Sequence, residues 1–124
     1  MSLTLTAYSP AGTTTNADGD QVPAYATEGT TLGKVQSGSQ AGTDTPTRYI
    51  LIGGIERPVL SGGLHIPISA DVPVASEQRG QAWEYQVTAI GTNDDPALLG
   101  KRFLVVGVPV KSKATARRLD VVEV

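Results

Sequence analysis

Trp83-Glu-Tyr-Gln-Val-Thr-Ala-Ile90 is the segment that decides the fold class, because apolar and polar side chains alternate along it. Trp83 and Tyr85 share one face with the other odd-numbered residues up to position 89, and Glu84 shares the opposite face with the polar residues. Alternation with a period of two is typical of a half-buried β-strand. We therefore expect a strand here, with Trp83 and Tyr85 as core residues.

Two more strands are predicted further along the chain, at 101–108 and 119–124. The first, Lys101-Arg-Phe-Leu-Val-Val-Gly-Val108, is apolar on both faces, which is typical of a central strand that is covered on both sides. The second, Leu119-Asp-Val-Val-Glu-Val124, closes the predicted domain. Towards the N-terminus the pattern is weaker, and extended segments are predicted at 3–8, 21–28, 31–37, 48–53, 55–60 and 64–69.

Segments rich in small and polar residues separate these strands. Residues 9–20, with Asp18-Gly19 as a turn, and residues 37–46 are expected to be long flexible loops. The pattern of an amphipathic helix is not sustained over more than about two turns anywhere. The sequence therefore predicts an all-β fold: a small β-barrel or sandwich of about six to eight short antiparallel strands, with little or no helix.

Length and composition limit what this chain can be. Its 124 residues predict a single domain spanning 1–124. The absence of cysteine excludes disulfides, thiolate metal sites and a cysteine nucleophile. The first residues show neither a basic nor an apolar signal region, and no apolar run approaches the roughly 18 residues of a membrane span. We expect a protein without a secretion signal or a membrane contact.

Charge is distributed unevenly, although the formal net charge is only −2. Residues 1–46 hold one base, Lys34, against four acids, whereas residues 101–119 hold six bases and no acid. Such a basic segment favours pairing with an acidic protein surface or with nucleic-acid phosphates. We predict that residues 111–118 form a basic loop and that an interface includes Lys101, Arg102, Lys111, Lys113, Arg117 and Arg118.

His65 is the only histidine. It lies in the predicted strand 64–69, which Pro67 marks as an edge strand because proline cannot donate to a ladder. Its expected place is the solvent-facing side of that strand. Ser69 and Asp71 make a catalytic triad formally conceivable, but a general base needs an oriented partner. We predict a structural or interface histidine, and no catalytic, cofactor-binding or metal-binding residue.

Several runs of residues resemble a known family. The run Asp18-Gly-Asp-Gln21, with Tyr25, Glu28-Gly29 and Gly33-Lys-Val-Gln36, resembles the opening hairpin of head-to-tail connector proteins of long-tailed bacteriophages. The later sequence is similar to the actinobacteriophage branch of that family. It comprises Gly63-Leu-His-Ile-Pro67, Trp83-Glu-Tyr85, Asp95-Pro-Ala-Leu-Leu-Gly-Lys-Arg-Phe103, Val105-Val-Gly-Val-Pro109 and Ala114-Thr-Ala-Arg-Arg-Leu-Asp-Val-Val-Glu-Val124.

The resemblance implies a virion structural protein without catalytic residues or cofactor. Such a head-closure (stopper) or adaptor subunit forms a homo-oligomeric ring of six or twelve copies in the phage neck and is assembled in the host cytoplasm. The ring binds the portal or adaptor protein above and the tail terminator or tail tube below, and packaged DNA passes through it. Carried onto this chain, a mobile lumen or docking loop would contain Ser37, Gln40, Thr43 and Asp44.

Other functions stay open at this stage. Within the virion class, the nearest alternative is a tail-completion or minor tail protein. Outside it, a small β-barrel could bind nucleic acid through the basic 111–118 loop, although aromatic residues for base stacking are missing there. A hydrolase centred on His65 is the least favoured alternative.

Overall fold

A computed structural model of the chain describes residues 3–35, 48–67, 70, 73–108 and 116–124. This part of the chain contains eight strands and one short 3-10 turn, so the predicted all-β fold is confirmed. The elements are β1 (Leu3–Thr15), β2 (Gln21–Val35), β3 (Tyr49–Ile52), β4 (Ile55–Pro58), β5 (Leu60–Pro67), β6 (Glu84–Ala89), η2 (Pro96–Leu98), β7 (Arg102–Gly107) and β8 (Ala116–Glu123).

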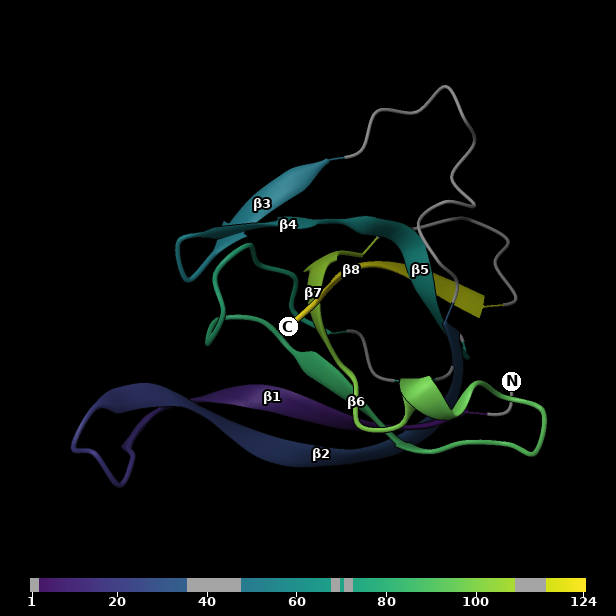
Figure 1. Cartoon of the computed structure of the whole chain (residues 1–124), viewed down its shortest axis with the longest axis horizontal. Coiled ribbons are helices and arrows are strands. Elements are labelled where there is room, and N and C mark those ends of the chain that lie inside the picture. The colour runs from purple at the N-terminus through teal and green to yellow at the C-terminus, as the bar shows by residue number, and fades with distance from the viewer. Residues whose placement is uncertain (1–2, 36–47, 68–69, 71–72, 109–115) are drawn as a thin grey trace.

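Six of the strands close into an antiparallel barrel with the order β1-β2-β5-β8-β7-β6 (Figure 1). The ring closes because β1 pairs with β6 as well as with β2. The remaining strands, β3 and β4, form a separate two-stranded ribbon joined by the Gly53-Gly54 turn, in which both glycines have positive φ. Closure removes the open sheet edges that an unpaired strand would expose.

Two apolar clusters stabilise this arrangement. The larger fills the barrel and includes Tyr85 and Phe103, while the smaller lies outside the barrel wall, where Ile50 and Ile52 of the ribbon pack on it. Strand β7 contributes to both clusters, with Phe103 inside the barrel and Leu104 beneath the ribbon. The prediction that this strand is covered on both sides is therefore correct. Trp83 packs against the interior cluster, as predicted.

The expected loop at residues 9–20 is much shorter than predicted. Strand β1 continues to Thr15 and pairs with β2 as far as Thr15 opposite Gln21, so only residues 16–20 form the turn. The sequence there is rich in threonine, whose branched side chain suits a strand, but it lacks the apolar alternation of a strand with a buried face. The expected loop at 37–46 lies outside the described residues.

The two strands expected at 21–28 and 31–37 are one long strand. Gly29 does not end β2 but lies at an irregularity in its pairing with β1, where the register shifts between Ala7 and Tyr8. Its φ of 141° lies in a region that glycine adopts at little cost. The shift is a β-bulge, a feature that bends a strand without interrupting the sheet.

The expectation that the segment around His65 is an edge strand is wrong. Strand β5 lies between β2 and β8 in the closed barrel. Pro67 is its last residue, where a missing backbone N–H interrupts no ladder. His65 is consequently buried, with 8% of its surface exposed, rather than solvated.

Candidate interaction site

The ends of β1 and β2 project from the barrel as a hairpin arm, defined here as residues 9–26 (Figure 1). Pairing of β1 with β6 stops at Tyr8, and pairing of β2 with β5 is confined to Lys34 and Val35. Beyond these points the two strands pair only with each other within the described chain, and residues 11–21 are all exposed. The arm is therefore a two-stranded ribbon in solvent with two free backbone edges.

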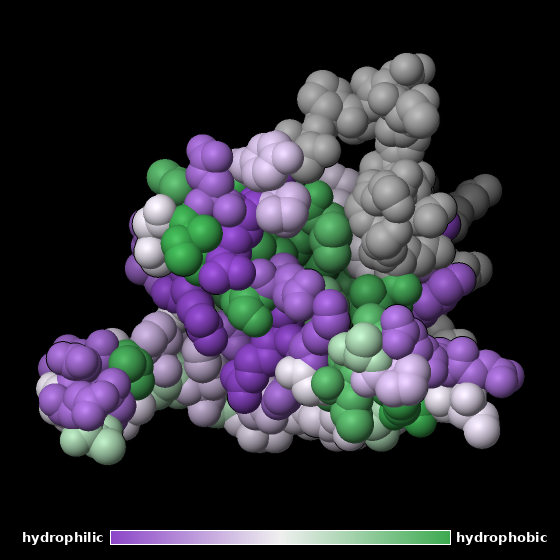
Figure 2. Space-filling view, in the orientation of Figure 1, coloured by the Kyte–Doolittle hydropathy of each residue, from purple (hydrophilic) through white to green (hydrophobic). Residues whose placement is uncertain are grey.

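The tip of the arm is an ordered turn that carries negative charge. The side-chain oxygen of Asn16 accepts hydrogen bonds from the backbone N–H groups of Asp18 and Asp20, both at 3.0 Å. Gly19 donates its N–H to the Asn16 carbonyl at 3.1 Å and has a φ of 85°. Among the described residues, neither the Asp18 nor the Asp20 carboxylate has a hydrogen-bond or ion-pair partner. In Figure 2 the end of the arm is a mostly hydrophilic knob.

A buried carboxylate anchors the arm where it leaves the barrel. Glu84 is fully buried and lies opposite Tyr8 in the β1–β6 register. It forms ion pairs with Arg79 at 3.1 Å and Arg102 at 3.3 Å, and the Arg102 guanidinium lies 5.2 Å from the centre of the Tyr8 ring. The Tyr8 hydroxyl donates to Gln86 at 3.3 Å. Glu84 does lie on the face of β6 opposite Tyr85, as the alternation predicts, but the base of the arm and two arginines cover it there.

The second strand of the arm is anchored to the same group. The hydroxyl of Tyr25 on β2 accepts a hydrogen bond from the Gly80 N–H at 2.9 Å, one residue beyond Arg79. Burial, and then the negative charge of Glu84, raises the pKa of the Tyr25 phenol above its ordinary value. The phenol therefore stays protonated beside this carboxylate at neutral pH. We call Glu84, Arg79, Arg102, Tyr8 and Tyr25 the arm anchor.

A row of three basic side chains crosses the opposite part of the barrel. Lys34 of β2 lies opposite His65 of β5, and His65 lies opposite Arg118 of β8. Residues that lie opposite each other project from the same side of a sheet. Here that side is the outer one, because the adjacent Leu64 and Leu119 fill the barrel. Lys34 and Arg118 are exposed and have no ion-pair partner within the described chain. We call these three residues the cation row.

His65 is held uncharged by its surroundings. Burial lowers the pKa of its imidazole below the ordinary value of 6.5, and the charges of Arg118 and Lys34 lower it further, while a hydrogen bond with the Gly62 backbone acts in the opposite direction. No acid is among the groups that shift its pKa. A general base needs a partner that orients it and stabilises its protonated form. Taken together, the surroundings of His65 instead favour its neutral form.

Four of the six basic residues predicted to form one interface lie among the described residues, and the structure separates these four. Lys101 pairs with Glu123 at 3.1 Å, and Arg102 belongs to the arm anchor, so each already has a partner in its own chain. Arg117 and Arg118 lie within β8 rather than in a loop. They project from opposite sides of that strand, and the Arg117 Nε is buried with no hydrogen-bond partner in the described part of the chain.

The other predicted site residues lie outside the described residues. They are Lys111 and Lys113 in the basic segment and Ser37, Gln40, Thr43 and Asp44 in the expected docking loop. Their contacts stay predictions.

The β3–β4 ribbon presents a different, apolar surface. Its inner residues Ile50 and Ile52 are buried, whereas Tyr49 and Leu51 on its outer face are 58% and 63% exposed. A groove of about 500 Å³ runs beside the ribbon and is lined by residues including Leu51 and Ile55. Contiguous exposed apolar residues of this kind are typical of contact surfaces between proteins.

Two absences among the described residues bear on the class of site. No group of three or more potential metal-ligating side chains occurs among them. Nor does that part of the chain contain a helix with the length and apolar character needed to cross a membrane.

Comparison with known proteins identifies the family. A family model described as a family of unknown function, DUF6093, matches residues 1–122. The chain belongs to this family. No curated protein and no solved structure matches it significantly. The barrel, the arm and the cation row described above are therefore structural observations on a member of DUF6093.

Sequence reasoning missed two features of this DUF6093 member, the arm anchor and the cation row. Glu84 could have been noticed as the acid in a strand with two flanking aromatic residues, but nothing in the sequence places Arg79 or Arg102 beside it. Lys34 was noticed as the sole base among residues 1–46 and as part of the run Gly33-Lys-Val-Gln36, but not as a neighbour of Arg118. Its proximity to Arg118 depends on barrel closure, which joins strands that are distant in sequence.

Proposed function

We propose that this protein is a non-catalytic, ring-forming subunit of a bacteriophage neck, a head-to-tail connector of the stopper or head-closure type. The ring would join the portal or adaptor to the tail and help to retain packaged DNA. The proposal begins from the family resemblance of residues 18–124, which covers most of the chain.

The observation that supports it best is the contrast between a closed barrel and its projecting arm. A barrel without open edges resists uncontrolled pairing, whereas an arm with two free edges and a charged tip is suited to a specific contact with a neighbour. The apolar outer face of the ribbon offers a further contact surface. An assembly subunit uses such surfaces, and it needs no oriented general base.

The proposal is tested by locating the protein in particles and by removing it. In a virus that carries the gene, we expect a cryo-EM reconstruction to place a ring of this barrel between portal and tail. Disruption of the gene is expected to yield tails that are not joined to heads, and heads that have lost DNA. Joined particles in the absence of the protein, or its location away from the neck, would refute the proposal.

One alternative has an observation in its favour. The cation row is a surface that phosphate groups could also contact, so a nucleic-acid-binding barrel remains the second candidate. It predicts that the isolated protein binds duplex DNA with an affinity that falls steeply with salt. Loss of that binding in Lys34→Ala and Arg118→Ala variants would favour it over the connector.

A further inference from the structure

We infer that the acidic tip of the arm, Asp18 and Asp20, binds the cation row of a second copy of this chain. The inference rests on the proposed function, since it names the contact by which neighbouring subunits would be joined. Within the part of the chain that the structure describes, the tip is ordered but its two carboxylates have no partner, and the cation row has no acidic partner.

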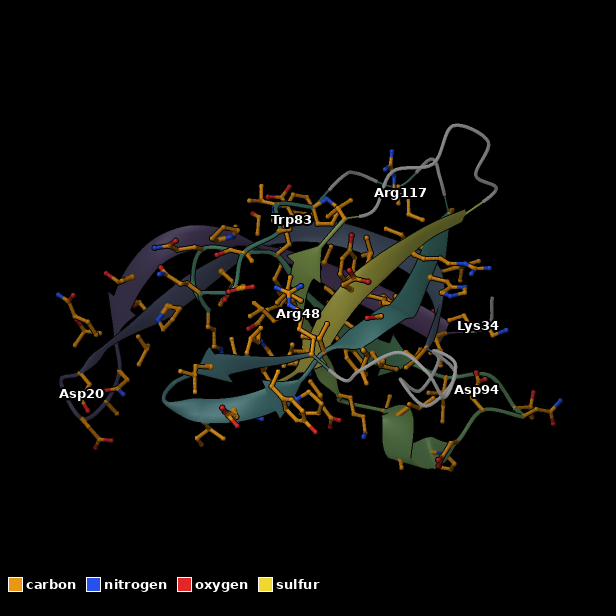
Figure 3. The ribbon with its side chains drawn as sticks, turned by 90° about the horizontal axis from the view of Figure 1, so that it is seen from above. Asp20, Lys34, Arg48, Trp83, Asp94 and Arg117 are labelled. Atoms are coloured by element: carbon orange, nitrogen blue, oxygen red, sulfur yellow. The ribbon has the colours of Figure 1, made fainter. Side chains whose placement is uncertain are left out.

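The two surfaces cannot meet within one molecule. Figure 3 places Asp20 and Lys34 at opposite ends of the long axis of the protein. The cross-strand register then fixes His65 and Arg118 beside Lys34, far from the tip. A contact between tip and row must therefore join two copies.

The arm is long enough to make that contact. Strand β1 continues for seven residues, Ser9–Thr15, beyond its last pairing with β6. At about 3.3 Å per residue this stretch spans about 23 Å, which is comparable with the width of a small barrel. The arm anchor holds both strands at their base, so the tip is presented in a defined direction.

The chemistry of the two surfaces is complementary in sign and in size. Neighbouring strands lie about 4.8 Å apart, so Lys34 and Arg118, on either side of His65, lie within about 10 Å of each other. Two carboxylates separated by one residue, as Asp18 and Asp20 are, can face two cations at that spacing. His65 between them carries no charge of its own, so the row offers two positive charges to two negative ones.

The geometry of this contact has a consequence for assembly. A tip that binds a different surface on its neighbour makes a heterologous contact, which leaves one tip and one row unused in every open chain. Such contacts continue until rotation brings the last copy back to the first. A closed ring satisfies every tip and every row, as does a two-fold dimer in which each tip binds the other copy's row, and the mass of the assembly in solution distinguishes the two.

Charge exchange tests the inference directly. We expect reversal of the tip (Asp18→Lys with Asp20→Lys) or of the row (Lys34→Glu with Arg118→Glu) to weaken self-association at least about tenfold, as measured by sedimentation of the full chain at low salt. Mixing the two reversed proteins is expected to restore association between them. The matched control is Glu56→Lys, an exposed acid on β4. Circular dichroism would establish that every variant is folded.

The absence of cysteine permits a second test that needs no stable ring. A tagged Asp20→Cys protein is mixed with an untagged Lys34→Cys protein and, in parallel, with an untagged Glu56→Cys protein, under mild oxidation at high concentration. We expect the tagged–untagged disulfide dimer to form at least about tenfold faster with Lys34→Cys, because bound tips hold the two thiols together.

Each outcome has a clear meaning. Equal cross-linking of the two mixtures, or rings that survive both charge reversals, overturns the inference while leaving the proposed function intact. Specific cross-linking by a protein that is absent from phage necks overturns the proposed function and leaves the inference standing. Binding of duplex DNA by the row, with the tip irrelevant to association, overturns the inference in favour of the nucleic-acid alternative.

Discussion

Strands β1 and β2 belong partly to the six-stranded barrel and partly to the arm, and the two parts are stabilised in different ways. The first half of β1 places Leu3, Leu5 and Ala7 in the barrel core, whereas its second half, Ser9–Thr15, buries no side chain. The first half is held by burial of apolar surface, and the second by backbone pairing and by the anchor at its base. The far arm therefore contributes little to the free energy of unfolding of the monomer. Because its side chains are not needed for folding, its sequence is free to serve a contact.

The largest expected effect comes from the barrel interior. Phe103→Ala is expected to lower the free energy of unfolding by about 3–5 kcal/mol, because a buried aromatic side chain is lost and a cavity remains. Denaturant titration would measure it. Thr14→Ala in the arm is the matched control and should change the value by less than about 0.5 kcal/mol. If the two variants lost similar amounts of unfolding free energy, the conclusion that the barrel and not the far arm stabilises the monomer would be wrong.

A smaller effect is expected at the arm anchor. Glu84→Gln keeps the shape of the side chain but removes the charge that pairs with two arginines, so we expect a loss of about 2 kcal/mol. Hydrogen exchange of the arm amides should accelerate at the same time, since the base of the arm is loosened. Glu56→Gln on the exposed face of β4 is the control. Unchanged exchange in the Glu84 variant would show that backbone pairing alone holds the arm.

The glycines of β1 and β2 allow a third comparison. A Cβ on Gly33 would collide with the side chain of Leu5 and lie 3.0 Å from the His65 carbonyl oxygen. Overpacking of this kind is expected to cost about 1–2 kcal/mol in Gly33→Ala, measured by thermal unfolding. Gly12→Ala meets no neighbouring atom, but it carries the cost of a φ of 83°. The two variants separate packing from backbone strain. In a Leu5→Ala background the destabilisation caused by Gly33→Ala should become smaller, because the colliding side chain is gone, whereas that caused by Gly12→Ala should not change.

The smallest effect is a dependence on pH. The pKa of His65 is lower in the folded protein than its ordinary value of 6.5, so the unfolded chain binds the proton more readily. The contribution of neutral His65 to the free energy of unfolding is therefore fully present above about pH 6.5. It is lost as the pH falls from there towards the pKa of His65 in the folded protein. We expect the wild-type protein to lose more stability than His65→Gln between pH 7 and about pH 5.5 in denaturant titrations. Parallel curves for the two proteins would contradict the proposed environment of His65.

The sequence predicted those parts of the fold that depend on local patterns. The alternation of residues 83–89 and the two apolar faces of residues 101–108 were sufficient to indicate an all-β domain with a doubly covered strand. The arm could not be predicted in this way, because a ribbon exposed on both faces carries no apolar alternation. Its turn at Asp18-Gly19 and part of its second strand, within the predicted segment 21–28, were recognised, whereas its first strand was expected to be a loop.

The candidate site was less predictable than the fold for a physical reason. Lys34 and Arg118 become neighbours only when β2, β5 and β8 pair, and the register of those pairs is set by packing of the whole barrel. The same is true of Glu84, whose burial depends on Arg79, Arg102 and the base of the arm. Basic residues close together in sequence, such as Arg117 and Arg118, were instead expected to act together, although a strand directs them to opposite sides.

The pairing of β1 with β6 also has a mechanical consequence. Both strands run along the direction in which the arm projects, so a pull on the arm by a neighbouring subunit acts parallel to β1. A load applied in that direction is shared by the whole β1–β6 pairing, which extends from Thr4 to Tyr8, whereas a peeling force would open that pairing one step at a time. The barrel is thus braced against tension transmitted through its own arm, and a chain of such subunits would resist stretching better than it resists prising apart.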